Sequence, residues 1–211
     1  MARISKEAKE KVRLALLATA ARHFAREGLA GANINDISTD AGFARGTVYN
    51  YFTSKEALFG AVLRAGTDLA VARARARGLS SGQSARQTLL LLAEEDVRLA
   101  RRNQAFVKVM LKELLSPHRA TRQHLEAATL PLREAVREAL EAGQTVGEVT
   151  DRHDANELAT LFLGQLTMLY VEHWSSGGAF PTWEKLPLVL VEGFFDGFRG
   201  AHAGAAVSAA R

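Results

Sequence analysis

The most informative segment of this chain is INDISTDAGFARGTVYNYFTSKEAL, which covers residues 34–58. Its first part, residues 34–41, predicts a short helix, because Asn33 before it can cap the first backbone amides. Gly42 ends this helix, and residues 45–52 predict a second helix almost at once. Two helices joined by a tight turn that contains glycine are typical of a helix-turn-helix motif.

The two sides of the predicted second helix differ in chemistry. Val48 and Phe52 form an apolar side that can pack on the preceding long helix. The outer side carries amide, guanidinium and hydroxyl groups, which hydrogen-bond base edges and phosphates in the major groove. An ordinary surface helix with half-buried tyrosines would show the same pattern. The candidate DNA-contacting residues are Arg45, Thr47, Tyr49, Asn50, Tyr51 and, just beyond the helix, Lys55.

The same segment closely resembles the signature of the tetracycline-repressor (TetR) family of bacterial regulators. The resemblance covers about residues 10–65 and rests on four features that occur together with the correct spacing. These are the Ala-Gly turn at 41–42, the Gly-Thr-x-Tyr core at 46–49, the aromatic Phe52 and the Ser-Lys-Glu-Ala-Leu run at 54–58. The resemblance implies a ligand-responsive transcriptional repressor that binds operator DNA as a dimer.

The resemblance also implies individual roles for the candidate residues. It makes Gly42 the turn, Arg45 a base or phosphate contact, and Thr47, Tyr49 and Lys55 contacts to the DNA backbone. Tyr51 stands where a histidine is common in the family, so it keeps a hydrogen-bond donor but differs in reach and charge. Asn50 occupies a variable position and is therefore the candidate for sequence discrimination, with adenine as its natural partner.

Positive charge is concentrated near the N-terminus. The chain has 211 residues and a net charge of +4. Residues 1–55 contain 9 Lys or Arg and 5 Asp or Glu, so residues 56–211 contain 18 of each. This bias favours a polyanionic partner, because each neutralised phosphate releases condensed counterions. A slightly basic, solvated surface would explain the same excess.

Helical periodicity dominates the whole chain, which predicts an all-α fold of about nine helices. Besides the motif, helices are predicted over 6–26, 54–77, 85–101, 105–115, 120–143, 154–175 and 183–202. Gly28 is the expected stop of the first helix, and Pro131 is expected to kink or divide the helix that contains it. The expected domains are a DNA-binding domain (1–54), a connecting helix (55–78), a helical ligand-binding and dimerisation domain (79–202) and a disordered tail (203–211).

The last two long helices are predicted to form a homodimer interface. Two such helices from each subunit can pack as a four-helix bundle, and recognition helices about 34 Å apart can then bind a near-palindromic operator. An internal core with no partner would show the same apolar stripes. The candidate interface residues are Leu158, Phe162, Leu186, Leu190, Gly193, Phe194, Gly197 and Phe198.

A pocket for a small, largely apolar effector is predicted in the C-terminal domain, since such sites are mostly apolar with a few oriented polar groups. Plain core packing would explain each apolar residue equally well. The candidate lining residues are Phe106, Met110, Leu114, Phe162, Gln165, Leu166, Leu169, Tyr170, His173 and Trp174. The effector is expected to favour a conformation with wrongly spaced recognition helices and so to release the operator.

Other classes of protein are not favoured by the sequence. There is no Gly-x-Ser-x-Gly elbow, phosphate-cradling glycine loop or zinc motif, so we expect no enzyme activity, cofactor or metal. The lack of cysteine excludes disulfides and thiolate metal sites. The lack of a signal-peptide pattern and of any apolar run of about 18 residues favours a soluble, cytoplasmic protein with no membrane partner. A ligand-independent regulator or an activator, whose C-terminal domain only dimerises, remains the alternative function.

Overall fold

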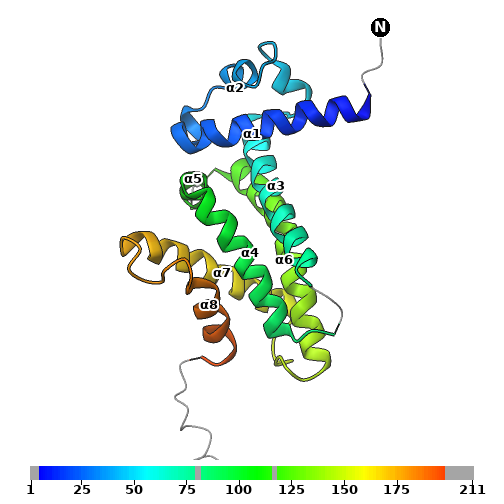
Figure 1. The fold of residues 1–211 in the computed structure, drawn as a ribbon, viewed down its shortest axis with the longest axis vertical. Helices are drawn as coiled ribbons and strands as arrows, with labels where there is room; N and C mark the ends of the chain where they lie inside the picture. Colours follow the sequence, from blue (N-terminus) through cyan, green and yellow to red (C-terminus); the bar gives the residue numbers. More distant parts are fainter. Residues whose placement is uncertain (1–4, 79–81, 116–117, 198–211) are drawn as a thin grey trace, which may run out of the picture. The chain divides into compact units, whose positions relative to one another are not determined.

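The structure, a computed structural model, describes residues 5–78, 82–115 and 118–197. Within these ranges every regular element is a helix, which confirms the predicted all-α class. The elements are α1 (Lys6–Gly31), α2 (Ile34–Asp40), the 3-10 helix η1 (Thr47–Asn50), α3 (Lys55–Ala76), α4 (Ala85–Arg102), α5 (Gln104–Leu114), α6 (Arg119–Thr145), α7 (Ala155–Ser175) and α8 (Leu186–Phe195) (Figure 1). No helix in the described ranges has both the length and the apolar character needed to cross a membrane.

Two glycines set helix limits in the N-terminal part. The sequence predicted that α1 stops at Gly28, and the backbone does leave helical geometry there, with φ 73 and ψ 174, before one more turn reaches Gly31. The helix predicted over 45–52 is a single 3-10 turn. Gly46 adopts φ 81, a left-handed conformation that suits glycine, so this turn begins only at Thr47.

Two prolines lie inside the C-terminal helices. Pro131 does not divide α6, which is one continuous element. Pro187 lies in the first turn of α8, where a missing backbone N–H breaks no helical hydrogen bond. The described α8 is therefore shorter than the helix predicted over 183–202, and the last five residues of that prediction lie outside the described part of the chain.

The chain divides into two compact units that interleave along the sequence. Unit 1 contains residues 1–72 and 98–132, and unit 2 contains residues 73–97 and 133–211. This pattern arises because α5 packs against α1 within unit 1. Helices α3, α4 and α6 each contribute residues to both units. The sequential domain boundaries expected from the sequence stay a prediction.

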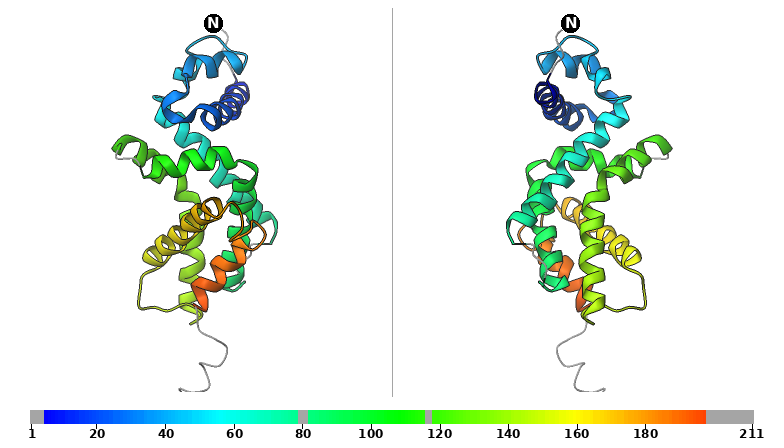
Figure 2. Two further views of the ribbon diagram at one scale, coloured as in Figure 1. Left: turned by 90° about the vertical axis from the view of Figure 1, so that its left-hand side faces the viewer. Right: turned by 90° about the vertical axis from the view of Figure 1, so that its right-hand side faces the viewer.

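Unit 1 is built around a row of three phenylalanine rings. The Phe59 ring of α3 lies 5.0 Å from Phe24 of α1 and 5.0 Å from Phe106 of α5, measured between centroids. Ile37 and Val48 are fully buried in the same core. Each fully buried side chain of this size stabilises the fold by about 1.5–3 kcal/mol. This core joins the helix-turn-helix segment to the longer helices, and Figure 2 shows α1 and α2 side by side in both views.

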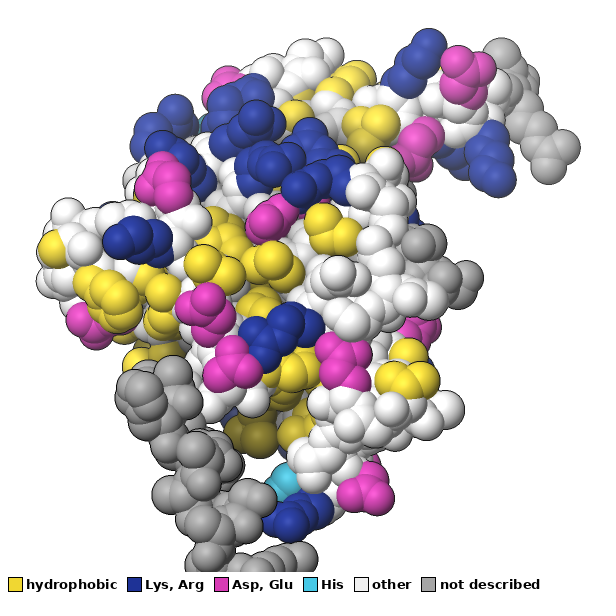
Figure 3. Space-filling view, turned by 60° about the horizontal axis from the view of Figure 1, so that its bottom comes forward, with side chains coloured by type: hydrophobic (Ala, Val, Ile, Leu, Met, Phe, Trp, Pro, Cys, Tyr) yellow, Lys and Arg dark blue, Asp and Glu magenta, His cyan; other side chains and the backbone are white. Residues whose placement is uncertain are grey.

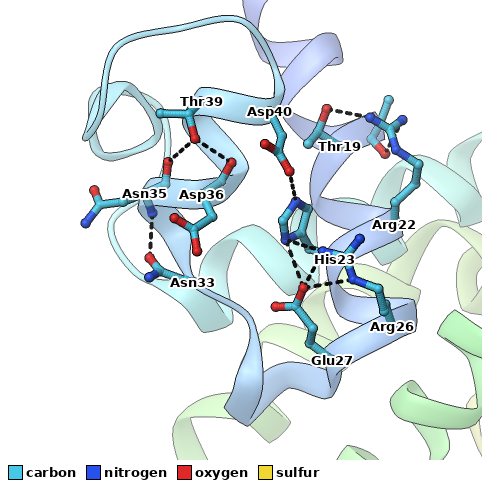
Figure 4. A network of polar contacts seen from close by, with 11 residues as sticks. Thr19, Arg22, His23, Arg26, Glu27, Asn33, Asn35, Asp36, Thr39 and Asp40 are labelled. Atoms are coloured by element: carbon cyan, nitrogen blue, oxygen red, sulfur yellow. Dashed lines mark hydrogen bonds and ion pairs between the residues drawn. The ribbon is translucent and has the colours of Figure 1, made fainter.

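A buried histidine links α1 to the end of α2 (Figure 4). His23 Nε2 lies 2.9 Å from Asp40 Oδ2, and its Nδ1 lies 3.3 Å from Glu27 Oε1. Arg26 also contacts Glu27, and its hydrogen bond is the main cause that holds the pKa of the Glu27 carboxyl below its usual range. Since Asp40 is the last residue of α2, the histidine fixes that end of the helix against α1.

Side chains pack closely against the backbone of α6 at Gly143 in unit 2. A Cβ atom on Gly143 would lie 2.6 Å from Val149 Cγ2 and 2.7 Å from Ala85 Cβ. Nearby, the Glu148 carboxylate accepts hydrogen bonds from the backbone N–H groups of Ala85 at 2.7 Å and Arg86 at 3.0 Å. These bonds satisfy amides at the start of α4 that have no partner within the helix. Gly143 therefore lets α6 approach the capped end of α4.

We predict that Gly143→Ala destabilises the protein by about 1–3 kcal/mol, because overpacking at this position outweighs the better helix propensity of alanine. Gly66→Ala is the matched control, since Gly66 is also helical and a Cβ there meets nothing within 4 Å. The control should gain about 0.5–1 kcal/mol in stability. Thermal unfolding of both variants measures the difference, and equal shifts would contradict the proposed close packing.

Candidate nucleic-acid interface

Two glycines shape the turn between α2 and η1. Gly42 adopts φ 84 and Gly46 adopts φ 81. Side chains rarely tolerate this left-handed region, so the turn depends on glycine at both positions. Asn33 begins the motif as predicted, because its Oδ1 accepts a hydrogen bond from the Asn35 N–H at 2.9 Å.

A buried hydroxyl joins the two helices of the motif. Ser38 of α2 is fully buried, and its Oγ accepts a hydrogen bond from the Val48 N–H at 3.2 Å. The Val48 side chain is also fully buried in the core of unit 1. The inner side of η1 is thus held by both a polar and an apolar contact, which leaves its other side exposed.

Three of the predicted DNA contacts lie on the exposed side. Arg45, Tyr49 and Asn50 are all exposed, and 57% of the Tyr49 surface is accessible. They present a guanidinium, a phenol hydroxyl and a carboxamide. These groups can hydrogen-bond both base edges and phosphates.

Two other predicted contacts are partly engaged within the fold. The Thr47 hydroxyl donates a hydrogen bond to the Ala44 carbonyl at 2.7 Å. Tyr51 is half-buried, and its ring centroid lies 6.5 Å from that of Phe52. The spacing of these residues in the sequence could not reveal which way their side chains turn.

Lys55, the sixth predicted contact, is the first residue of α3, and its side chain reaches the C-terminal end of α1. Its ammonium group donates hydrogen bonds to the carbonyls of Ala30 at 2.8 Å and Ala32 at 3.1 Å. A cation is favourable there, because the free carbonyls at a helix C-terminus carry partial negative charge. Lys55 therefore stabilises the fold of the motif in addition to any contact with a ligand.

A hollow of about 580 Å³ lies beside η1. Its lining residues are Ala32, Asn33, Ile34, Tyr49, Thr53, Ser54 and Lys55. Asn33, Thr53 and Ser54 were not among the sequence candidates. Asn33 and Ser54 cap the starts of α2 and α3, so helix-cap positions next to the motif were the available signal. The hollow combines hydroxyl, amide and ammonium groups, a set that suits a phosphate.

The predicted dimer residues lie mostly inside unit 2. Leu158, Phe162, Leu186 and Leu190 are buried where α7 packs against α8. Phe194 is half-buried and meets the Phe162 ring edge to face at a centroid distance of 5.3 Å. Of the remaining candidates, Gly193 is half-buried, Gly197 is exposed and Phe198 lies outside the described residues.

The predicted effector-pocket residues fall into both units. Phe106, Met110 and Leu114 belong to the phenylalanine core of unit 1 or pack against it. In unit 2, Gln165 is exposed and the others are buried or half-buried. The buried ones are Phe162, Leu166, Tyr170 and His173, and the half-buried ones are Leu169 and Trp174.

Comparison with known proteins identifies relatives of this chain. The family model described as "Bacterial regulatory proteins, tetR family" matches residues 16–62. The chain is 30% identical over 170 residues to the HTH-type transcriptional repressor KstR2 of Rhodococcus jostii (strain RHA1), an overlap of 79% of this chain and 81% of that protein.

Solved structures show the same fold. The transcriptional regulator FadR of Bacillus subtilis, in complex with stearoyl-CoA, superposes with a TM-score of 0.77 at 18% identity, over 88% of this chain and 99% of that one. A protein of Saccharomonospora viridis in complex with choline gives a TM-score of 0.63 at 25% identity, over 87% of this chain and 95% of that one.

We predict that Ser38→Ala destabilises unit 1 by about 1–3 kcal/mol, because it leaves the buried Val48 N–H without an acceptor. Thr39→Ala is the neighbouring control, since Thr39 is exposed and only hydrogen-bonds carbonyls of its own helix. That variant should change stability by no more than about 0.5 kcal/mol. Chemical denaturation measures both, and a Ser38→Ala protein as stable as the control would refute the role given to this hydroxyl.

Proposed function

Because the chain belongs to the TetR family of bacterial transcriptional regulators, we propose that it represses transcription as a homodimer that binds a near-palindromic operator and is released by a small effector. The exposure of Arg45, Tyr49 and Asn50 on one side of an anchored motif is the observation that carries the DNA-binding part. In this proposal Asn50 and Arg45 read base edges and Tyr49 lies against the backbone.

The hollow beside η1 is proposed to hold a backbone phosphate. Tyr49, Thr53 and Lys55 line it and can supply hydroxyl and ammonium donors. Ser54 caps α3 through a 3.0 Å hydrogen bond from the Ala57 N–H, so the partly positive start of a long helix lies at the same place. The ammonium group of Lys55 would then serve the carbonyls of α1 and the phosphate together.

The dimer is proposed to form through the exposed side of α7. Apolar side chains gather in patches on the surface that Figure 3 shows. On α7 the exposed apolar positions Leu161, Met168 and Val171 follow helical spacing, and the exposed Gly164 falls between them. Leu188 of α8 is also 48% exposed. This side of α7 is exposed in the part of the chain that the structure describes, whereas the stripe predicted from the sequence is mostly buried within one chain.

Effector response is proposed from family membership. The two structural relatives described above hold chemically different ligands, stearoyl-CoA and choline, so the effector class has to be inferred from the residues of this chain. We place the effector site in unit 2, around Leu166, Tyr170, His173 and Trp174. Coupling of about 1–3 kcal/mol would lower operator affinity about 5- to 150-fold.

DNA binding is tested with fragments that flank the protein's own coding region, by fluorescence anisotropy at several salt concentrations. Arg45→Ala, Tyr49→Ala and Asn50→Ala should each weaken binding to one fragment by about 1–3 kcal/mol. Leu115→Ala, which truncates another highly exposed side chain of unit 1, should have no effect. Equal, weak binding to all fragments would argue against a nearby operator. If no bound small molecule changes the affinity, the ligand-independent regulator is the better assignment.

Dimerisation is tested with Met168→Arg, which places a charge in the middle of the exposed apolar side of α7. Because an unpaired charge in an interface core is costly to desolvate, we expect a monomer in sedimentation velocity. Val146→Arg is the control, since Val146 is 76% exposed and lies outside α7. A dimer that survives Met168→Arg would show that another surface is used.

A further inference from the structure

We propose that Asp96, Tyr170, Trp174 and Trp183 form a binding site for an ammonium cation with apolar substituents, and that such a cation is the effector. This inference rests on the proposed ligand-responsive function and names the chemical class of the ligand. All four residues belong to unit 2.

The first observation is a carboxylate without a counter-charge. Asp96 of α4 is half-buried, and its Oδ2 accepts a hydrogen bond from the Tyr170 hydroxyl at 2.6 Å. Within residues 5–78, 82–115 and 118–197, no Lys, Arg or His forms an ion pair with Asp96. The adjacent Glu95, in contrast, lies 3.0 Å from the guanidinium of Arg77. Asp96 is therefore a partly buried carboxylate with no cationic partner among the described residues.

The electrostatics agree with this geometry. Burial raises the pKa of the Asp96 carboxyl above its usual range, and the hydrogen bond from Tyr170 offsets only part of that rise. Burial, together with Asp96, also holds the pKa of the Tyr170 phenol well above its usual range. The hydroxyl therefore stays protonated and donates a hydrogen bond to Asp96. A ligand that brings a positive charge would remove the penalty on the ionised carboxylate.

The second observation is a triangle of aromatic rings next to this acid. The centroid of Tyr170 lies 6.0 Å from Trp174 and 6.0 Å from Trp183, and the two indoles are 5.9 Å apart. Tyr170 is buried, so a cation would approach the triangle over the two indoles, and cation–π attraction extends to about 6 Å from a ring centroid. Both indoles are half-buried, so part of their surface is accessible to a ligand.

A histidine supports the triangle. His173 Nδ1 donates a hydrogen bond to the Pro181 carbonyl at 2.6 Å, and the ring centroid lies 4.2 Å from Trp183. These contacts hold the loop after α7 against the helix and so position Trp183. The rings are therefore placed before any ligand binds, which lowers the entropic cost of binding.

Tyr170 connects the two observations, because its hydroxyl contacts Asp96 and its ring belongs to the triangle. The acid contributes charge and the rings contribute polarisable, apolar surface. Only a cation with apolar substituents satisfies both. A neutral ligand would leave the carboxylate unbalanced, and an anionic ligand would be repelled by it.

The site carries its own optical probe, since Trp174 and Trp183 are the two tryptophans of the chain. Tryptophan emission of the full-length protein is titrated with choline, tetramethylammonium and benzyltrimethylammonium. In parallel it is titrated with 3,3-dimethylbutan-1-ol, which has the shape of choline without its charge. We expect a saturable change with at least one cation, and binding of the alcohol weaker than that of choline by about tenfold or more.

Asp96→Asn removes the charge but keeps an acceptor for Tyr170, and it should weaken binding of the cation by about tenfold or more. Asp151→Asn is the control, since Asp151 is an exposed acid of the same unit and its loss changes the net charge equally. Circular dichroism confirms folding of both variants. If Asp96→Asn does not fold, the comparison of choline with the alcohol in the wild-type protein decides alone.

Three results would overturn the proposal: no saturable change with any of the three cations, an alcohol that binds as tightly as choline, or an Asp96→Asn protein that binds the cation like wild type. Operator binding is measured on the same samples. Operator binding without a cation response rejects the cation site and leaves the proposed repressor standing. A cation response without operator binding supports the cation site and rejects the proposed repressor.

Discussion

The contact of one phenylalanine with two others holds the DNA-binding segment in shape. Phe59 packs against Phe24 on one side and Phe106 on the other, so α1, α3 and α5 share a single core. The motif needs this support, because α2 has 7 residues and η1 has 4, and isolated helices this short are not stable in water. Ile37 and Val48 insert into that core. Because Val48 points inward, the opposite side of η1 is exposed. The position of every proposed DNA contact follows from this packing.

The sequence was sufficient to predict the fold class and the motif, since helical periodicity and turn chemistry are local signals. Arg45, Tyr49 and Asn50 are exposed on η1 and the turn before it, and their contacts with DNA stay a prediction. The sequence carried no signal for the hydrogen bonds that the Lys55 ammonium group donates to carbonyls more than twenty residues earlier. Nor could the sequence show which apolar side of α7 is buried within the chain and which is exposed. Leu158 and Phe162 have the spacing of an interface stripe, but a stripe buried inside one chain and a stripe buried between chains obey the same periodicity. The exposed Leu161 and Met168 could be distinguished only once the structure showed which side of α7 is buried within the chain.

Two neighbouring acids on α4, Glu95 and Asp96, make different contacts. Side chains of consecutive helical residues point about 100° apart, so Glu95 and Asp96 face different surroundings. Glu95 forms an ion pair with Arg77, and both residues belong to unit 2. Asp96 instead accepts a hydrogen bond from the Tyr170 hydroxyl and has no ion pair with a described residue. The aromatic surroundings explain why sequence patterns favoured an apolar effector there, since a single acid on another helix carries no periodic signal.

The interleaving of the two units limits how this chain can exchange parts with a relative by recombination. The compact unit that holds the DNA-binding segment does not end at residue 72, because unit 1 also contains residues 98–132. A crossover after α3 would join the motif to a foreign α5 and replace Phe106, the ring that closes one side of Phe59. The new protein would have to supply an aromatic ring of matching size at that point. Substitution of exposed residues such as Arg45 and Asn50 leaves this core intact, whereas transfer of the whole N-terminal segment does not.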